Sequence, residues 1–287
     1  MKKPILFLFV LMLALSSSAQ TDYDKLTKLF TKALEYSSKG DYGNAISSYQ
    51  KALEMEPHNY TLHLNLGYCY SQIAEYDKAI EQYNKAAILR QDDYKVYSNR
   101  GNAQANLGRY KGAVRDIKRA MRIREEDGSQ GMDTLYFNLG DCYRKWGKFD
   151  SAIVYYEEGL EYDHKSVSNR MNIAFTYIEM EEYELAEAHL IELVKEVPEI
   201  SNNHNNLGYV YLKLGDLEKA EKHVLDAKKI EPGNSWIYRN LGLIYKAKGE
   251  KKQACNQLDK ALKLEFVKYW GTDYIQELLD YCNQNPE

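Results

Sequence analysis

Apolar and small side chains recur along the chain with a period of 34 residues, and within each period they form two helical stripes. Positions 4, 7, 8 and 11 of each period follow i, i+3, i+4, i+7 spacing and predict a first helix, while positions 20, 24 and 27 predict a second. A short segment, often with Gly, separates the two stripes. The pattern predicts seven helix-turn-helix repeats, numbered 1 to 7, at 26–59, 60–93, 94–127, 133–166, 167–200, 201–234 and 235–268.

Small residues mark the places where the two helices of a repeat should meet. Position 8 is Gly or Ala in every repeat, and position 11 is Tyr in six of the seven. We expect the small residues to let the two backbones approach, with the tyrosine at position 11 filling the space beside them. Position 20 is alanine in all seven repeats: Ala45, Ala79, Ala113, Ala152, Ala186, Ala220 and Ala254.

This pattern resembles the tetratricopeptide repeat, whose signature combines a 34-residue period with Leu-Gly, Tyr, Ala and Pro at set positions. Three of the 5 prolines, Pro57, Pro198 and Pro232, stand between repeats, where they interrupt no helix. The resemblance covers residues 26–268. It implies an all-α fold, a right-handed superhelical solenoid of seven repeats followed by a C-terminal capping helix.

A stack of hairpins leaves an apolar face open at its end, which a cap must cover. The C-terminal segment, 269–287, contains an apolar stripe that predicts such a helix over 273–283, with Asp273 and Gln276 as a capping box. A spacer at 128–132 interrupts the register between repeats 3 and 4. The spacer is either a slightly longer loop without a further role or a hinge between the repeats on its two sides.

The N-terminus has the pattern of a secretory signal. Two lysines precede an apolar run from Ile5 to Leu15, and small residues follow at Ser17 and Ala19. Eleven apolar residues are too few to cross a hydrocarbon core of about 30 Å. We predict a signal peptide at 1–19, a lead-in at 20–25, export to the periplasm or extracellular space, and no stable membrane span after cleavage.

The 4 cysteines of an exported chain raise the question of pairing. Cys69 and Cys142 occupy the same position two repeats apart, so we expect both to be buried free thiols. Cys255 stands near the start of the last second helix, and Cys282 near the end of the predicted cap. Since the chain runs down one helix and back along the next, these ends meet, and we predict a Cys255–Cys282 disulfide.

Charge and composition argue against nucleic-acid binding and against catalysis. The chain has 38 Lys+Arg against 42 Asp+Glu, a net charge of −4, which leaves no basic excess for a phosphate backbone. It lacks a zinc-hydrolase histidine pair, a nucleophile elbow and a glycine-rich phosphate loop. We therefore expect no enzyme, no cofactor and no metal site.

The resemblance also implies where a partner binds. In tetratricopeptide repeat proteins, positions 2, 5, 9, 12 and 13 of the first helices line a concave groove that receives an extended peptide or a partner helix. Aromatic and Met side chains there are typical interface anchors, although some of them can instead contact the neighbouring repeat. The candidate partner-binding residues are Leu64, Tyr68, Asn102, Phe137, Arg144, Met171, Phe175, Asn205, Tyr209, Trp236 and Arg239.

Asparagine occupies position 6 in six repeats, and two interpretations of it stay open. It grips a ligand backbone, as in some relatives, or it satisfies polar groups between neighbouring helices. For the whole chain, the sequence favours a non-catalytic protein-protein interaction scaffold of the cell envelope or secreted space. The alternative is a glycan-binding or cell-wall-associated module that uses exposed tyrosines, although most of the 26 tyrosines fall at packing positions.

Overall fold

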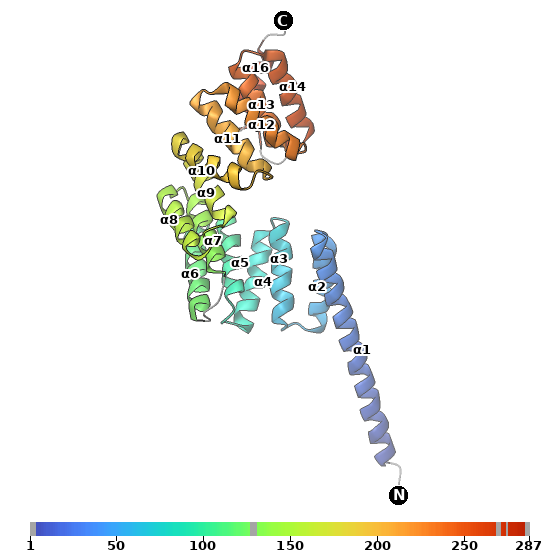
Figure 1. The fold of residues 1–287 in the computed structure, drawn as a ribbon. Coiled ribbons are helices and arrows are strands. Elements are labelled where there is room, and N and C mark those ends of the chain that lie inside the picture. Colours follow the sequence, from blue (N-terminus) through green and yellow to red (C-terminus); the bar gives the residue numbers. More distant parts are fainter. Residues whose placement is uncertain (1–3, 127–130, 268–270, 274, 285–287) are drawn as a thin grey trace. The chain divides into compact units, whose positions relative to one another are not determined.

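The computed structural model describes residues 4–126, 131–267, 271–273 and 275–284 of the 287-residue chain. Every regular element within these residues is an α-helix, as the sequence predicts (Figure 1). The helices group into two compact halves, an N-terminal half over Met1–Trp146 and a C-terminal half over Gly147–Glu287.

The N-terminal half is a row of helices in which each one packs against the next along the chain (Figure 1). Asp41 and Asn59 begin two of these helices, since their side chains accept hydrogen bonds from the backbone N–H groups of Asn44 and Leu62. The helices are α1 (Pro4–Ser38), α2 (Tyr42–Met55), α3 (Tyr60–Gln72), α4 (Tyr76–Leu89), α5 (Tyr94–Asn106), α6 (Tyr110–Glu126) and α7 (Met132–Lys145).

The C-terminal half continues the alternation of first and second helices and ends in a shorter one. That last helix packs against both helices of the final hairpin. The helices are α8 (Phe149–Tyr162), α9 (Val167–Glu179), α10 (Tyr183–Glu196), α11 (Ser201–Leu214), α12 (Leu217–Ile230), α13 (Ser235–Ala247), α14 (Lys251–Lys263) and α16 (Gln276–Asn283).

The small residues lie where the helices of a hairpin touch. All seven alanines at position 20 are fully buried. A Cβ placed on Gly67 would lie 2.6 Å from Cε1 of Tyr83, and one on Gly101 would lie 2.7 Å from Cγ1 of Ile117. The close approach of the two helices, which the sequence predicts, is therefore confirmed at these positions.

The tyrosine that fills this space is not the one the sequence predicts. Tyr70, at position 11, is half-buried, whereas the ring against Gly67 belongs to Tyr83 at position 24. Tyr49, Tyr83 and Tyr156, all at position 24, are at most 1% exposed. Position 24 projects from the second helix toward the first, so its side chain meets the glycine directly.

Position 15 forms the turn inside each hairpin and takes a left-handed backbone conformation in all seven repeats. Five repeats have glycine there, as in Gly108 with φ 72°. Repeats 2 and 5 instead place Ala74 and Glu181 in the same conformation, with φ of 59° and 62°. The turn geometry is thus kept even where a side chain makes it unfavourable.

Helix α1 runs without interruption through the predicted signal cleavage point. Among the side chains of α1 that the structure describes, those of residues 20–25 are exposed, while Leu26, Leu29 and Phe30 pack against the core that α1 shares with α2. In the part of the chain that the structure describes, no helix has an apolar stretch long enough to cross a membrane.

The cap helix starts later than the sequence predicts, and most of the predicted spacer falls outside the residues that the structure describes. The cap helix α16 begins at Gln276, three residues after the predicted start, and its N-cap is Ile275, so Asp273 does not form the expected capping box. Residues 128–130 of the predicted spacer lie outside the described residues. Of its other two residues, Gly131 precedes α7 with φ 99° and Met132 is the first residue of that helix.

Candidate functional site

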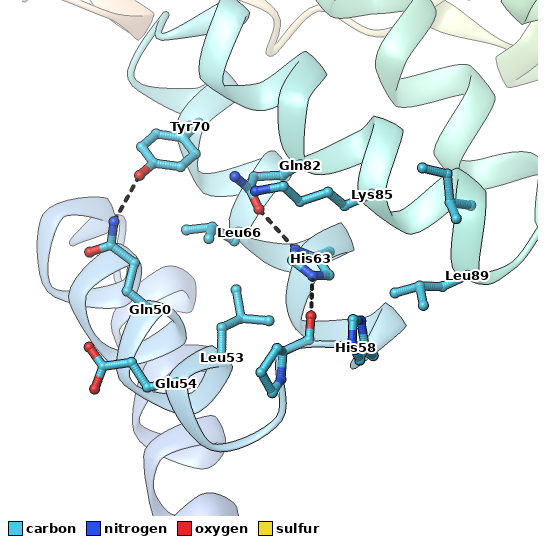
Figure 2. Close-up of a pocket in the computed structure, with 12 residues that line it drawn as sticks. Gln50, Leu53, Glu54, His58, His63, Leu66, Tyr70, Gln82, Lys85 and Leu89 are labelled. Atoms are coloured by element: carbon cyan, nitrogen blue, oxygen red, sulfur yellow. Dashed lines mark hydrogen bonds between the residues drawn. The ribbon is translucent and has the colours of Figure 1, made fainter.

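A cleft of about 750 Å³ opens between α2 and α4 in the N-terminal half (Figure 2). Buried residues of α3, His63 and Leu66, lie at its floor. Its volume is within the range of about 300–1,000 Å³ that is typical of ligand sites. Its walls come from the second helices of repeats 1 and 2, so it is distinct from the first-helix groove that the sequence predicts.

The lining of this cleft is mainly apolar. Leu53 comes from α2, Leu66 and Tyr70 come from α3, and Ile88 and Leu89 come from the end of α4. Ile88 is 77% exposed and Leu89 is 39% exposed, although both belong to a helix whose other apolar residues are packed. Exposed aliphatic side chains at the rim of a cleft are typical of an interaction site.

Polar contacts hold the walls in place. The ring of His63 bridges the Pro57 carbonyl oxygen, 2.9 Å from Nε2, and the Gln82 side chain, 2.9 Å from Nδ1 (Figure 2). Across the cleft, the Gln50 amide donates to the Tyr70 hydroxyl at 3.1 Å. These hydrogen bonds connect α2, α3 and α4, so the cleft is preformed.

A second cleft, of about 690 Å³, occupies the corresponding place in the C-terminal half, between α8 and α10. It is more charged than the first. Arg170 from α9 donates to Glu196 at 2.5 Å and lies 3.8 Å from Glu192. Its other lining residues are Leu160, His164, Lys165, Val167, Ile173, His189 and Val197.

The two clefts share positions in the repeat. Position 4 is His63 in the first cleft and Arg170 in the second, and position 23 is Gln82 in the first and His189 in the second. Sequence reasoning missed both clefts. The available signal was the appearance of polar residues at position 4, which the helical period assigns to packing, and at position 23, next to the packing position 24.

The predicted partner-binding residues of the N-terminal half differ in exposure. Tyr68 is 43% exposed, and its ring meets the edge of Tyr42 at 6.4 Å between centroids. Leu64 is half-buried against the core of repeat 2. Asn102, Phe137 and Arg144 are half-buried as well. Arg144 donates a hydrogen bond to Asp141 at 2.9 Å.

In the C-terminal half, Tyr209, Trp236 and Arg239 form one cluster. The Arg239 guanidinium lies 5.1 Å from the ring centroid of Tyr209 and 5.5 Å from that of Trp236. Trp236 also meets Phe266 of the last hairpin edge to face, 5.0 Å between centroids. These aromatic anchors are therefore half-buried by packing, as are Met171 and Phe175.

Asn205 corrects one prediction. Its side chain is 4% exposed, and its amide oxygen accepts a hydrogen bond from Asn240 at 3.0 Å. Asn240 is a position-6 asparagine, and another of these, Asn138, donates to Ser98 at 3.1 Å. Both bonds join first helices of neighbouring repeats. They favour the structural interpretation of position 6, and they leave Asn205 buried between helices rather than facing a partner.

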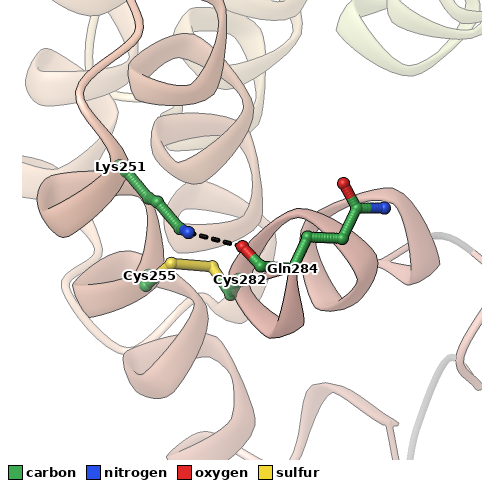
Figure 3. The surroundings of a disulfide bond; sticks show 4 residues. All are labelled: Lys251, Cys255, Cys282 and Gln284. Carbon is green, nitrogen blue, oxygen red and sulfur yellow. Dashed lines mark hydrogen bonds between the residues drawn. A yellow bond between two sulfur atoms is a disulfide. The ribbon is translucent and has the colours of Figure 1, made fainter. Parts of the chain in front are cut away.

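The cysteines are arranged as the sequence predicts. Cys255 of α14 and Cys282 of α16 form a disulfide with their Cα atoms 5.7 Å apart (Figure 3). Beside it, Lys251 donates to the Gln284 carbonyl oxygen at 2.6 Å. Cys69 and Cys142 are buried free thiols. The disulfide therefore fastens the cap helix to the last hairpin.

Within each half, successive helices pack against one another along the chain, which defines a helical-repeat protein. Four family models described as Tetratricopeptide repeat match residues 36–107, 92–163, 173–235 and 237–267. The chain therefore carries tetratricopeptide repeats across these residues, and its all-helical architecture with a C-terminal helix is confirmed. Proteins built from these repeats are generally non-catalytic scaffolds for protein interactions.

Solved structures with the same fold include a tetratricopeptide repeat protein from Parabacteroides merdae, with 22% identity and a TM-score of 0.71. The match covers 90% of this chain and 99% of that one. PilF of Pseudomonas aeruginosa has 20% identity and a TM-score of 0.58, covering 76% and 96%. PilW, a type IV pilus biogenesis factor, has 19% identity and a TM-score of 0.64, covering 74% and 96%. No curated protein matches the sequence.

Proposed function

We propose that this protein is a non-catalytic scaffold that binds an extended, apolar segment of a partner protein in the cleft between α2 and α4. One observation carries the proposal: Ile88 and Leu89 are exposed at the rim of a preformed, mainly apolar cleft. Burying these two side chains under a partner would remove apolar surface from water, which stabilises a complex by about 25 cal/mol per Å² before the costs of association.

Partner capture from the native envelope fraction tests this proposal. The double substitution Ile88→Ser and Leu89→Ser should reduce capture at least about tenfold, because each removes an aliphatic side chain that the bound partner would bury. The matched control is Ile73→Ser, which is also exposed, at 44%, but lies at the end of α3 outside the cleft. Equal capture by both variants, at unchanged far-UV circular dichroism, would reject the α2–α4 cleft as the site.

The first-helix surface is the second candidate site for the same function. It is supported by the cluster in which Arg239 lies over Tyr209 and Trp236, since aromatic and Arg side chains dominate interface energetics. Substituting Phe175→Ala and Trp236→Ala should weaken capture if this surface binds the partner, with helicity unchanged. Loss of capture in this pair, together with full capture in the Ile88/Leu89 pair, would transfer the function to the first helices.

We further propose that the protein works outside the cytoplasm, in the envelope or the secreted space. The N-terminal pattern of charged, apolar and small residues supports this, and so does the Cys255–Cys282 disulfide, since such bonds persist in oxidising compartments. Leu26, Leu29 and Phe30, which pack in the first core cluster, all follow the predicted cleavage point. Protein purified from its native cells should begin at Gln20, as read by N-terminal sequencing; a start at Met1 would contradict export by this signal.

A glycan-binding role has weaker support. Among the described residues, the tyrosines that are more than a third exposed are Tyr23, Tyr68 and Tyr162. They lie on α1, α3 and α8, so they do not form a common aromatic platform. Glycan-array binding that persists after substitution of both protein-binding surfaces would revive this alternative.

A further inference from the structure

The hairpin of α11 and α12 brings two histidines and an aspartate together. His204 lies in the first turn of α11, while His223 and Asp226 lie one turn apart on α12. The Nδ1 atoms of the two histidines are 3.4 Å apart, and one ring nitrogen of each histidine lies within 4.8 Å of a carboxylate oxygen of Asp226. We propose that these three side chains form a binding site for a divalent transition metal ion of the zinc class.

The separation of the two nitrogens suits such an ion. Two ligand atoms on a tetrahedral zinc ion, with bonds of about 2.0–2.1 Å, lie about 3.3–3.4 Å apart. The distance of 3.4 Å between His204 Nδ1 and His223 Nδ1 matches this separation. Two imidazoles and one carboxylate are ligands that zinc shares with nickel and copper, whereas calcium and magnesium prefer oxygen ligands alone.

The protein already fixes the orientation of His204. Its Nε2 lies 3.1 Å from the carbonyl oxygen of Pro198, which can only accept a hydrogen bond. Nε2 therefore carries the proton, and in the neutral ring the lone pair is on Nδ1, which faces His223. Metal-binding histidines typically donate their second N–H to a carbonyl or carboxylate in this way. His204 is 7% exposed, so burial also holds the ring in place.

The second histidine, His223, is half-buried on α12. Burial, followed by the nearby His204 and Lys222, lowers its pKa against the opposing effect of Asp226. Stacking on Tyr211, with 5.5 Å between the ring centroids, orients the His223 ring. For Asp226, burial raises the pKa, but the hydrogen bond and charge of Lys229 outweigh burial, and the net pKa is lowered.

Lys229 does not occupy the whole carboxylate. It donates to Oδ1 of Asp226 at 2.8 Å, and a carboxylate has a second oxygen that can ligate an ion. A metal there would connect α11 to α12 through three bonds. The fourth tetrahedral position would take a water molecule or a side chain from a partner.

The site is particular to repeat 6 and is not a general feature of the fold. Repeat 2 has the same His at position 4, and His63 also contacts a proline carbonyl through Nε2. Its Nδ1, however, faces the Gln82 amide, and position 26 is Lys85, so the other two ligands are missing. Within the described ranges, no other three His, Cys, Asp or Glu side chains meet as these do.

Zinc and cobalt titration of the full-length, tag-free, EDTA-treated chain tests the proposal. We expect one zinc ion per chain by calorimetry, a cobalt complex with the visible absorption of tetrahedral coordination, and an EDTA-reversible rise in the melting temperature. Loss of an outer-shell partner costs about 10–100-fold in metal affinity, so loss of a ligand should cost more. His223→Gln and Asp226→Asn should each weaken zinc binding about 100-fold or more.

Two controls make a negative result decisive. His189→Gln changes the histidine at the same position in repeat 5 and should leave zinc affinity unchanged. Replacing both free thiols, Cys69→Ser and Cys142→Ser, should also leave it unchanged and excludes a cysteine site. Circular dichroism verifies that each variant is folded. The proposal is overturned if the chain takes up no zinc, or if His223→Gln and His189→Gln bind it equally well.

Discussion

The backbone of Gly67 in α3 lies against the ring of Tyr83 in α4, so closely that a Cβ on residue 67 would be 2.6 Å from Cε1 of the tyrosine. Gly67→Ala gains about 1 kcal/mol of helix propensity but must displace this buried ring, which costs typically about 1–3 kcal/mol. We expect a net loss of stability of about 1 kcal/mol, measured by urea unfolding.

Gly43→Ala is the matched control for this prediction. Gly43 is in the first turn of α2, and its nearest neighbour would be 4.0 Å from an added Cβ, so the substitution should be neutral or slightly stabilising. Combining Gly67→Ala with Tyr83→Leu should recover part of the loss, because the smaller side chain leaves room. If both glycine variants are equally stable, the contact between α3 and α4 is looser than described.

The sequence could identify the small residues but not the ring that meets them. Alanine at position 20 and glycine at position 8 recur in register, so their packing role follows from the period. Tyrosine occurs at both position 11 and position 24, and periodicity places both on the inner face of their helices. Only the orientation of Tyr83 and Tyr70 about their helix axes distinguishes them, and this depends on how the two helices cross.

The left-handed turn residues give a second prediction. Ala74 and Glu181 have φ of 59° and 62°, at the position where five repeats have glycine. For a residue with a Cβ, this conformation costs about 1–2 kcal/mol. Glycine avoids this cost, but it loses more conformational entropy on folding, which offsets part of the gain. Ala74→Gly and Glu181→Gly should each stabilise the protein by about 0.5–1 kcal/mol. The converse substitution, Gly108→Ala, should destabilise it by a similar amount in the same unfolding assay.

Arg100 and Asp116 give a third prediction. Asp116 is 4% exposed and accepts hydrogen bonds from Arg100 Nε at 2.7 Å, Arg100 Nη2 at 2.8 Å and Gln104 Nε2 at 2.8 Å. Asp116→Ala leaves the arginine without its buried partner, so we expect a loss of about 3–5 kcal/mol in the free energy of unfolding. Asp77→Ala, which breaks the exposed pair with Arg109, should change little. Similar effects in both variants would contradict the importance of burial.

Asp116 also shows why the clefts could not be predicted. It occupies position 23, as do Gln82 and His189 of the clefts and His223 of the proposed metal site. The predicted packing stripe of the second helix runs through positions 20, 24 and 27 and does not include position 23, and the family resemblance directed attention to the first helices. Which polar side chain lines a cleft, pairs with an arginine or meets a second histidine depends on its neighbours in the folded chain, and a single sequence does not show them.

The buried tyrosines predict loss of stability at high pH. Burial raises the pKa of Tyr49 to about 12, and burial together with the hydrogen bond to Glu221 raises that of Tyr245 to about 12. In the unfolded chain these hydroxyls ionise near pH 10, so between about pH 10 and 12 the folded state retains protons that the unfolded state releases. Stability should therefore fall as the pH rises through this range. Melting temperatures from pH 8 to 12, with tyrosinate absorbance at 295 nm, measure it; a constant melting temperature would contradict it.

The disulfide and the cap helix give the last prediction. Cys255 and Cys282 are 27 residues apart in the chain, and a loop of this length corresponds to about 3–4 kcal/mol of lost entropy in the unfolded state. Leu278 of α16 is fully buried against Gly242 of α13, 2.9 Å from the place that a Cβ on residue 242 would occupy, so the cap covers the open end of the last hairpin.

Without the disulfide, α16 should detach before the other helices unfold. In the Cys255→Ser/Cys282→Ser variant, hydrogen exchange should accelerate first in α16 and then in α13 and α14, while α3 and α4 stay protected. Cys69→Ser/Cys142→Ser, which removes the free thiols, should exchange like the parent protein in α16. Equal protection of α16 with and without the disulfide would show that burial of Leu278 alone holds the cap in place.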